Sequence, residues 1–227
     1  MIIPIFNERD NLFEIINRVR SVEIPKQIII IDDYSTDGTR EMLRNDVENR
    51  FPDVVVLYQN VNSGKGACIR LAIPKLTGEF AIIQDGDLEY DPNDYHRILG
   101  AFEDPLISAV YGSRFMEEWP AMKLPNKIVN KLLATMVRVF YKIPMTDEAT
   151  CYKAFRTYIL QSIPLECSRF EFCPEITAKL ARSKHQIAEV PIQYKARTIS
   201  QGKKIRWTDG VVAIGTLLRY VFWRRRY

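Results

Sequence analysis

The feature that most constrains this chain is a short apolar run that ends abruptly in acid. Residues 80–83 are apolar, and carboxylates then recur at every second position, at Asp85, Asp87, Glu89 and Asp91. The apolar run predicts a buried strand, and Gly86 permits a sharp bend where that strand ends. Carboxylates this close repel one another unless a cation or a hydrogen-bond donor lies among them. Hard oxygen ligands on a loop suit Mg²⁺ or Mn²⁺. The simpler alternative is an acidic, solvated turn before a helix that starts at Pro92.

Apolar segments alternate with segments of helical periodicity along the first half of the chain. We predict strands at residues 1–6, 27–31, 54–58 and 79–84, and helices at 8–22, from 37 or 39 to about 47, and after residue 66. This alternation predicts an α/β fold with a mostly parallel, Rossmann-like central sheet flanked by helices. With 227 residues and 47% hydrophobic content, the chain can bury a full core. We expect one catalytic domain at 1–194 and an appendage at 195–227.

Polar clusters follow the first, second and fourth predicted strands. Ligands of such sheets bind at the carboxyl ends of the strands. We therefore expect Glu8, Asp33, Asp85 and Asp87 to converge on one crevice. Converging acids without a cation would destabilise the fold, which favours a site with a metal and a polar ligand.

The net charge of +4 is unevenly distributed. From Lys195 onward there are nine Lys or Arg residues against Asp209 alone, a net charge of +8, whereas residues 1–194 carry −4. An anionic partner at one end is therefore expected, either membrane phosphates or nucleic acid. In the tail, residues 207–227, apolar side chains recur at roughly helical spacing from Val211 to Phe222, and this apolar stretch is too short to span a bilayer. This pattern fits an interfacial amphipathic helix on anionic lipid or a helix docked on the domain's own core.

Several site classes have no support in the sequence. The four cysteines show no Cys-x-x-Cys spacing and the two histidines stand apart, so neither a zinc cluster nor a disulfide framework is indicated. The loop at 64–66 lacks the P-loop spacing, and no Gly-x-Gly-x-x-Gly follows the first strand. The apolar start is too short for a signal peptide. We therefore expect a reduced, cytosolic setting.

Five motifs occur together in a fixed order: Pro4-x-Phe6-Asn7-Glu8, Ile31-Asp32-Asp33-x-Ser35-x-Asp37-Gly38-Thr39, Asn62-x-Gly64-Lys65-Gly66, Asp85-x-Asp87 and Gly112-Ser113-Arg114. In this order the chain resembles family 2 glycosyltransferases, and most of all the dolichol- or polyprenyl-phosphate mannose synthases. The resemblance extends from Met1 to about Lys204. It implies a GT-A fold and an inverting, metal-dependent transfer of a sugar from a nucleotide-diphosphate sugar to a lipid phosphate.

The resemblance also implies roles for individual residues. The nucleotide pocket would be formed by Pro4, Phe6, Glu8, Ile31 and Asp33. The donor diphosphate would lie along Asp85, Gly86 and Asp87, with Asp87 and Glu89 as ligands of Mg²⁺ or Mn²⁺, and Arg197 and Lys203 as basic contacts. Arg114 would meet the acceptor phosphate, and Asp147 would position the site.

Three departures from the family pattern affect these roles. Phe6 stands where many relatives have Tyr, Glu89 where they often have Gln or Ser, and Cys151 where they have a small Gly or Ser. The first change removes a hydroxyl and the second adds a charge beside the predicted metal. The third lies in residues 146–153, a segment that resembles the acceptor-side motif of the family.

A phosphate acceptor is already ionised near neutral pH and needs no strong general base, which agrees with the lack of a convincing catalytic histidine. GDP-mannose is the favoured donor and UDP-glucose the alternative. A second possibility is a sugar or protein hydroxyl as acceptor, with Asp147 as the base. The non-enzymatic alternatives are a silent nucleotide-binding relative and a nucleic-acid-binding protein, and the acidic body argues against the latter. We expect a protein on the cytoplasmic face of a membrane, bound to an anionic surface and not to nucleic acid.

Overall fold

The computed structural model describes residues 1–48, 50–117, 122, 124–196 and 207–224. Within these described residues, seven strands form two sheets: β1 (Ile2–Ile5), β2 (Ile28–Asp32) and β3 (Val54–Tyr58) in the first, and β4 (Phe80–Ile82), β5 (Ile107–Ser113), β6 (Lys153–Arg156) and β7 (Gln186–Pro191) in the second. The first sheet is parallel in the order β1-β2-β3. The second has the order β4-β6-β5-β7, with β6 antiparallel to both neighbours and β7 parallel to β5.

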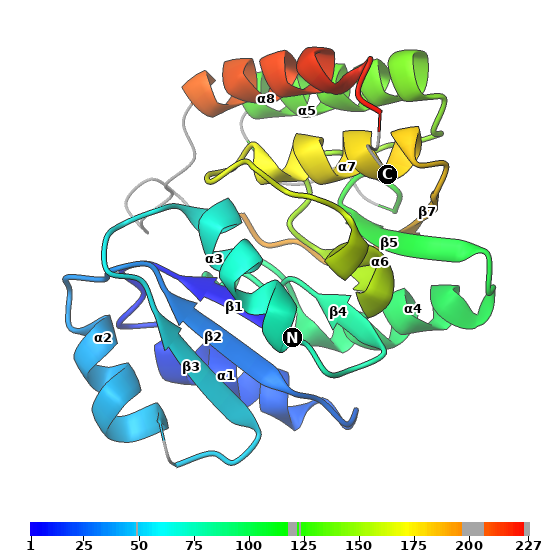
Figure 1. Cartoon of the computed structure of the whole chain (residues 1–227). Helices are drawn as coiled ribbons and strands as arrows, with labels where there is room; N and C mark the ends of the chain where they lie inside the picture. The colour runs from blue at the N-terminus through cyan, green and yellow to red at the C-terminus, as the bar shows by residue number, and fades with distance from the viewer. Residues whose placement is uncertain (49, 118–121, 123, 197–206, 225–227) are drawn as a thin grey trace.

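A narrow seam joins the two sheets. Ile2 and Ile83 form a parallel bridge, and the amide of Gln84 donates to the carbonyl of Ile2 at 2.9 Å. The strands therefore run in the order β3-β2-β1-β4-β6-β5-β7 across the molecule (Figure 1). The loop after β4, which carries the acidic series, begins at this seam. The predicted α/β architecture with a mixed, mostly parallel sheet is confirmed.

Helices cover both faces of the sheet (Figure 1). The α-helices are α1 (Leu12–Ser21), α2 (Thr39–Met42), α3 (Lys65–Ala72), α4 (Tyr95–Gly100), α5 (Leu124–Met136), α6 (Thr157–Ser162), α7 (Phe172–Arg182) and α8 (Trp207–Tyr220). Shorter helical turns are η1 (Leu43–Val47), η2 (Ile73–Lys75), η3 (Pro92–Asp94), η4 (Ala101–Glu103) and η5 (Val137–Tyr141). Helices α5 and α8 lie side by side as an outer layer above α7 (Figure 1).

Strand β2 shows why an unbroken apolar run was the correct sign of a central strand. Its residues Ile28 to Ile31 are all fully buried. Successive side chains of a strand point to opposite faces. Ile29 and Ile31 accordingly belong to one core cluster, and Ile28 and Ile30 to the other. Because both faces of the sheet are covered, the strand needs no polar alternation.

The first helix begins later than its periodicity predicted. We expected residues 8–22, but α1 starts at Leu12. The amide of Asn11 donates to the carbonyl of Glu8 in a turn, while the amides of Glu8 and Arg9 donate to Thr39 and Asp37. These residues are therefore held by the neighbouring loop and not by helical hydrogen bonds.

The last helix is fastened to α7 by a buried polar cluster. The Lys179 Nζ, fully buried, donates to Glu175 Oε1 at 2.7 Å, and the Tyr220 hydroxyl lies 3.2 Å from the same oxygen. Leu217 of α8 is also fully buried. Glu175 in addition accepts hydrogen bonds from the amides of residues 166 and 167. Among the described residues, no helix combines the length and the apolar character needed to cross a bilayer.

Candidate active site

The loops that follow β1 and β2 are joined by hydrogen bonds between backbone and side chains. Asn7 has a left-handed backbone, with φ of 51°, and its amide donates to Ser35 Oγ at 2.9 Å. In return, the amide of Thr36 donates to Asn7 Oδ1 at 2.8 Å. Together with the bond from the Glu8 amide to Thr39 Oγ1, these contacts make one rigid rim from two motifs that are far apart in the sequence.

Asp33 organises a third loop. Its two carboxylate oxygens accept from the amides of Ser63, at 2.7 Å, and Gly64, at 2.8 Å. Gly64 has φ of 92° and ψ of 163°, a conformation that is essentially restricted to glycine. A β-carbon there would also lie 2.6 Å from the carbonyl oxygen of Ser168. Asp33, predicted as a donor contact, thus fixes the loop that leads into α3.

Of the acids predicted to converge, Asp33 and Asp85 contact adjacent residues, Gly64 and Lys65, and the protein itself supplies part of the balancing charge. Lys65, at the start of α3, forms an ion pair with Asp85. Burial works against the ammonium group, but Asp85 outweighs this effect and the pKa of Lys65 is raised. A β-carbon on Gly86 would lie 3.7 Å from the side chain of Glu8. The repulsion among acids, from which the sequence argument inferred a metal, is therefore relieved in part by a lysine.

Asp87 and Glu89 remain the residues suited to a divalent cation. They lie on the loop after β4, half-buried, with the amide of Glu89 donating to Asp87 Oδ1 at 3.2 Å. Groups of three or more metal-ligating side chains are absent from the described part of the chain. Two neighbouring carboxylates still fit Mg²⁺ or Mn²⁺, because these ions often take one or two protein carboxylates and complete their shell with water and substrate phosphate. The chemistry of this donor set therefore suits the ion.

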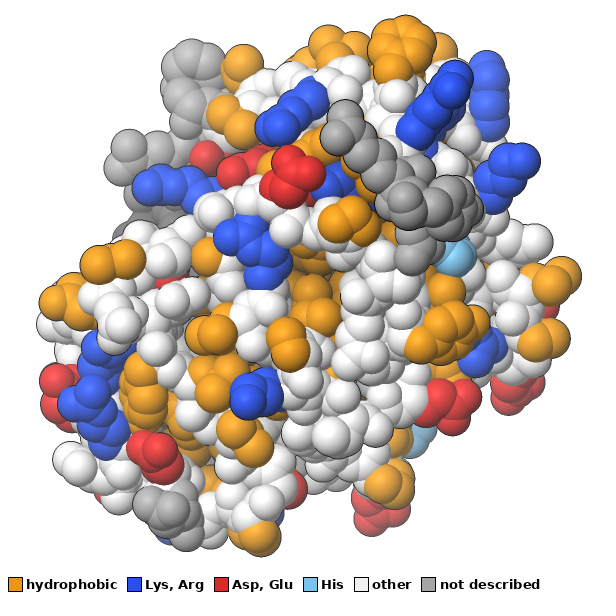
Figure 2. Space-filling model, viewed as in Figure 1, with side chains coloured by type: hydrophobic (Ala, Val, Ile, Leu, Met, Phe, Trp, Pro, Cys, Tyr) orange, Lys and Arg blue, Asp and Glu red, His pale blue; other side chains and the backbone are white. Residues whose placement is uncertain are grey.

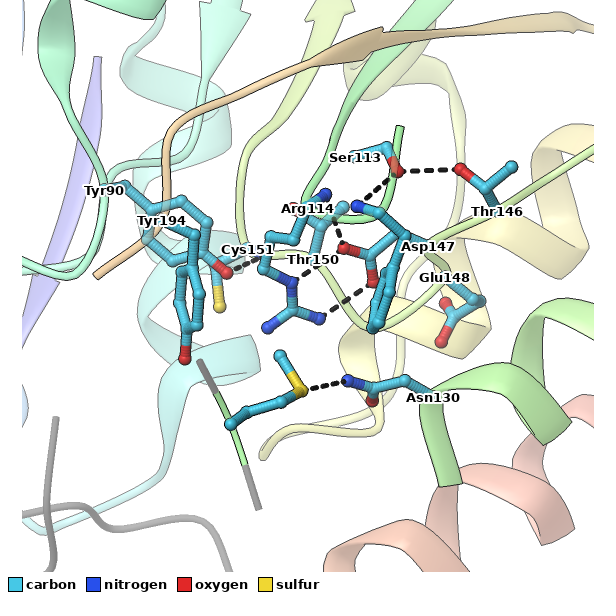
Figure 3. Close-up of polar contacts among 12 residues, drawn as sticks. Tyr90, Ser113, Arg114, Asn130, Thr146, Asp147, Glu148, Thr150, Cys151 and Tyr194 are labelled. Carbon is cyan, nitrogen blue, oxygen red and sulfur yellow. Dashed lines mark hydrogen bonds and ion pairs between the residues drawn. The ribbon is translucent and has the colours of Figure 1, made fainter. Parts of the chain in front are cut away.

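Arg114 is held by Asp147 in a bidentate ion pair (Figure 3). Nε and Nη2 donate to the carboxylate at 2.7 and 2.8 Å, and the amide of Arg114 donates to the same group at 3.0 Å. Asp147 is fully buried and the Arg114 side chain is 7% exposed. Burial alone would lower the pKa of Arg114, yet Asp147 outweighs it and the pKa is raised. Asp147 is therefore placed to hold the guanidinium.

Glu189 was missed by the sequence argument. This residue of β7 accepts from the amides of Thr146 and Asp147 at 2.6 and 2.9 Å, and from Thr146 Oγ1. Thr146 Oγ1 in turn lies 2.7 Å from Ser113 Oγ, next to Arg114 (Figure 3). Glu189 thus fixes the segment that carries Asp147. Nothing in the local sequence around Glu189 distinguishes it from an ordinary strand residue.

Cys151 lies among these groups, as Figure 3 shows. Its amide donates to the Tyr90 hydroxyl at 3.1 Å. Burial, reinforced by Asp85, raises the pKa of the Cys151 thiol to about 12. The thiol therefore stays protonated near neutral pH and is poorly suited to act as a nucleophile.

The other residues predicted to contact the donor lie partly in and after strand β1, partly in the buried strand β2, and partly outside the described residues. Pro4 and Ile31 face each other in the β1–β2 ladder, and Phe6 follows β1. The Ile31 side chain is fully buried in the core, so a nucleotide could reach this residue only through its backbone. Arg197 and Lys203 lie outside the described residues.

Comparison with known proteins identifies the family. The family description "Glycosyl transferase family 2" matches residues 1–163. A curated relative, undecaprenyl-phosphate 4-deoxy-4-formamido-L-arabinose transferase of Klebsiella pneumoniae, is 26% identical over 210 residues, which are 89% of this chain and 61% of that protein. The chain thus spans about three-fifths of the length of this relative.

Solved structures agree on the fold. Glucosyl-3-phosphoglycerate synthase of Mycobacterium tuberculosis, solved with Mn²⁺, UDP and glucosyl-3-phosphoglycerate, is 15% identical with a TM-score of 0.73, covering 98% of this chain and 79% of that one. A mannosyltransferase of Pyrobaculum calidifontis, solved with GDP-mannose and Mn²⁺, is 20% identical with a TM-score of 0.56, covering 83% and 53%. Both likenesses support the GT-A fold. The chain belongs to glycosyl transferase family 2, whose model matches the part of the sequence that contains all five motifs.

Proposed function

We propose that this protein transfers a sugar from a nucleotide-diphosphate sugar to a polyprenyl phosphate at a membrane surface. The observation that carries the proposal is a guanidinium fixed beside a carboxylate loop. Tyr194 contacts both, because its hydroxyl donates to Glu89 at 2.8 Å and Arg114 lies 5.0 Å from the centre of its ring. A loop whose carboxylates suit a cation and an arginine that suits a phosphate thus lie close together, which supports binding of a donor diphosphate beside an acceptor phosphate.

The residues divide the chemistry between them. Asp87 and Glu89 would hold Mg²⁺ or Mn²⁺, which when bound stabilises the negative charge on the departing nucleotide diphosphate. Arg114 binds the acceptor phosphate. A planar guanidinium makes strong, charge-assisted hydrogen bonds to phosphate oxygens. Asp147 accepts from Nε and from one N–H of Nη2, which leaves Nη1 and the second N–H of Nη2 to donate to the phosphate.

The burial of Asp147 favours a phosphate acceptor over a hydroxyl acceptor. A hydroxyl acceptor needs a general base within hydrogen-bonding reach of its proton. Asp147 is fully buried, and both of its oxygens accept hydrogen bonds from Arg114. A phosphate acceptor needs no such base, because it is already ionised near neutral pH. Transfer to sugar or protein hydroxyls is therefore the second candidate.

The outer layer of helices supplies a surface for the lipid. Exposed apolar side chains lie on α5 and α8 and just beyond α8; we call this set the α5–α8 face: Leu124, Ile128, Leu132, Val211, Val212, Leu218 and Phe222. Exposed basic residues accompany it at Lys131, Arg138, Lys142, Arg219 and Arg224. In Figure 2, hydrophobic side chains gather along the top edge, with Lys and Arg beside them. Apolar and basic side chains together suit the surface of an anionic membrane.

The donor and the membrane face complete the proposal. Mannose from GDP-mannose is the transfer that the sequence resemblance favours, and UDP-glucose is the alternative donor. The named Klebsiella relative acts on a different sugar, 4-deoxy-4-formamido-L-arabinose, with undecaprenyl phosphate. Binding to the cytoplasmic face of the membrane follows from the expected reduced setting and is part of the same proposal.

The direct test is transfer of radiolabelled sugar to a short polyprenyl phosphate with Mn²⁺ or Mg²⁺. GDP-mannose and UDP-glucose are compared, with EDTA as the metal control. We expect transfer from one donor, lost with EDTA and in Asp87→Asn. Asp91→Asn is the matched control. Asp91 accepts a hydrogen bond from the backbone amide of Asn93 at the start of η3, and the side-chain oxygen of an asparagine at position 91 can accept the same bond. Nucleotide binding without transfer to the lipid phosphate would overturn the acceptor assignment.

A further inference from the structure

The segment after β7 returns to the centre of the site and is held on both sides. The amide of Ile192 donates to the carbonyl of Ser113 at 3.1 Å, and the amide of Lys195 donates to the carbonyl of Glu89 at 2.8 Å. Tyr194 forms an isolated antiparallel bridge with Tyr90. The backbone of Tyr194 is therefore fixed relative to the end of β5 and to the acidic loop after β4.

Gly112 allows Ile192 to lie directly against strand β5. A β-carbon at this position would lie 2.6 Å from Ile192 Cγ2 and 2.8 Å from Ile192 Cδ1, closer than real side chains pack. The Gly-Ser-Arg motif thus has a structural use for each residue. The glycine admits Ile192, the serine supports Thr146 at 2.7 Å, and the arginine forms the ion pair with Asp147.

The Tyr194 side chain has two ends with different contacts. Its hydroxyl donates to Glu89 Oε2 at 2.8 Å. Its ring lies against Tyr90, with the ring centres 5.3 Å apart, and the Arg114 guanidinium carbon lies 5.0 Å from the Tyr194 ring centre. Figure 3 shows Tyr194 and Tyr90 on one side of Arg114 and Asp147 on the other. One aromatic residue therefore links the carboxylate suited to the cation with the arginine suited to the phosphate.

We propose that Tyr194 is a positioning residue with two separable roles: its hydroxyl orients Glu89 for the divalent cation, and its ring holds Arg114 for the acceptor phosphate. The inference rests on the proposed function and assigns parts of that site to a residue outside the five motifs. A partner that orients a metal-ligating carboxylate typically affects metal affinity by about 10-fold to 100-fold. A ring face against a guanidinium contributes through the cation–π attraction and does not depend on the hydroxyl.

Two substitutions separate these roles. Tyr194→Phe keeps the ring and removes the hydroxyl, whereas Tyr194→Leu removes both. Tyr220→Phe is the matched control, because it also removes a phenol hydroxyl next to a buried carboxylate, that of Glu175, but at the contact between α7 and α8. Mn²⁺ affinity in the presence of GDP or UDP is measured by electron paramagnetic resonance. Affinity for a short, water-soluble prenyl phosphate is measured by calorimetry, without turnover.

We expect Tyr194→Phe to weaken Mn²⁺ binding about 10-fold and to leave prenyl phosphate affinity within about twofold. Tyr194→Leu should weaken both, and Tyr220→Phe neither. In a Glu89→Gln background, the effect of Tyr194→Phe on Mn²⁺ binding should disappear, which keeps the test of the hydroxyl valid if Tyr194→Leu does not fold.

Unchanged Mn²⁺ affinity in Tyr194→Phe, or a wild-type protein that binds no Mn²⁺ with either nucleotide, would overturn the role of the hydroxyl. Unchanged prenyl phosphate affinity in a folded Tyr194→Leu would overturn the role of the ring. Because both affinities are measured without sugar transfer, the two proposals fail separately. The expected split in a protein that transfers no sugar would support the inference about Tyr194 and overturn the proposed function.

Discussion

The two halves of the candidate site are built by different means. On the side of the first sheet, loops are fixed by backbone amides that donate to short side chains, as from Ser63 and Gly64 to Asp33. On the side of the second sheet, the central contact joins two charged side chains, Arg114 and Asp147, with Glu189 behind them. The first half therefore relies mainly on loop conformation, with one buried ion pair between Arg40 and Asp32, and the second relies on the balance of buried charge.

This difference determines how each half should fail. A loop held by amides tolerates changes in the side chain of a residue that donates to Asp33 only through its amide, such as Ser63, but not a change in backbone conformation. A buried ion pair is costly to break, because the remaining charge loses its partner in a poorly solvated place. Substitutions that break a buried charge contact and substitutions that change the backbone conformation should therefore affect the two halves differently. We order these substitutions from the largest expected effect to the smallest.

Asp147→Asn should have the largest effect on stability. It leaves the buried Arg114 guanidinium without its carboxylate, and breaking such a pair costs about 3–5 kcal/mol. Urea unfolding measures the loss, and sugar transfer should fall with it. Glu14→Gln is the control, because its pair with Arg18 is about half exposed and is expected to contribute about 0.5 kcal/mol or less. Equal losses in the two variants would show that the buried Arg114–Asp147 pair contributes no more to stability than an exposed pair.

Gly64→Ala tests the half built on backbone conformation. The left-handed φ and the carbonyl of Ser168 both oppose a β-carbon, so we expect a loss of about 1–3 kcal/mol together with weaker nucleotide binding. Thermal unfolding and calorimetric titration with GDP or UDP measure the two effects. Gly100→Ala, in α4, meets no atom within 4 Å and should be neutral or slightly stabilising. Wild-type nucleotide affinity in Gly64→Ala would show that this loop conformation is not needed by the donor.

Glu189→Gln should give the smallest change in the free energy of unfolding. We expect a change on the order of 1 kcal/mol, because one hydrogen-bonded group loses its charge. Burial raises the pKa of Glu189, although the amides of Asp147 and Thr146 oppose the shift. Folding then favours the protonated form. The contribution to stability is fully present below the pKa of the unfolded chain and is lost as the pH rises through the higher pKa of the folded chain.

The free energy of unfolding of the wild type, relative to Glu189→Gln, should therefore decrease as the pH rises above the ordinary pKa of a glutamate, about 4.3, and through the higher pKa of Glu189 in the folded chain. Urea unfolding at a series of pH values tests this slope. A difference that grows with pH would mean that the ionised carboxylate is favoured by folding.

The same contrast explains what could be predicted from the sequence. The loops after β1 and β2 could be placed because parallel strands bring their carboxyl ends to one edge. The ion pair of Lys65 with Asp85 was not foreseen, because a helix had to be placed against β4 first. Glu189 and Tyr194 could not be found, because they meet Asp147 and Glu89 across separations of 42 and 105 residues. Such contacts depend on the order of strands in the second sheet, which local periodicity does not determine.

The cluster of Lys179, Glu175 and Tyr220 limits how this protein can be re-engineered. Glu175 binds the amides of residues 166 and 167, and the neighbouring Ser168 packs against Gly64. The final helix thus shares a carboxylate with a segment that supports the loop of Asp33. A chimera with a foreign tail in place of α8 would need an aromatic ring against Lys179 at position 220 and an apolar residue at 217. Helix α8 therefore helps to support the loops of the candidate site.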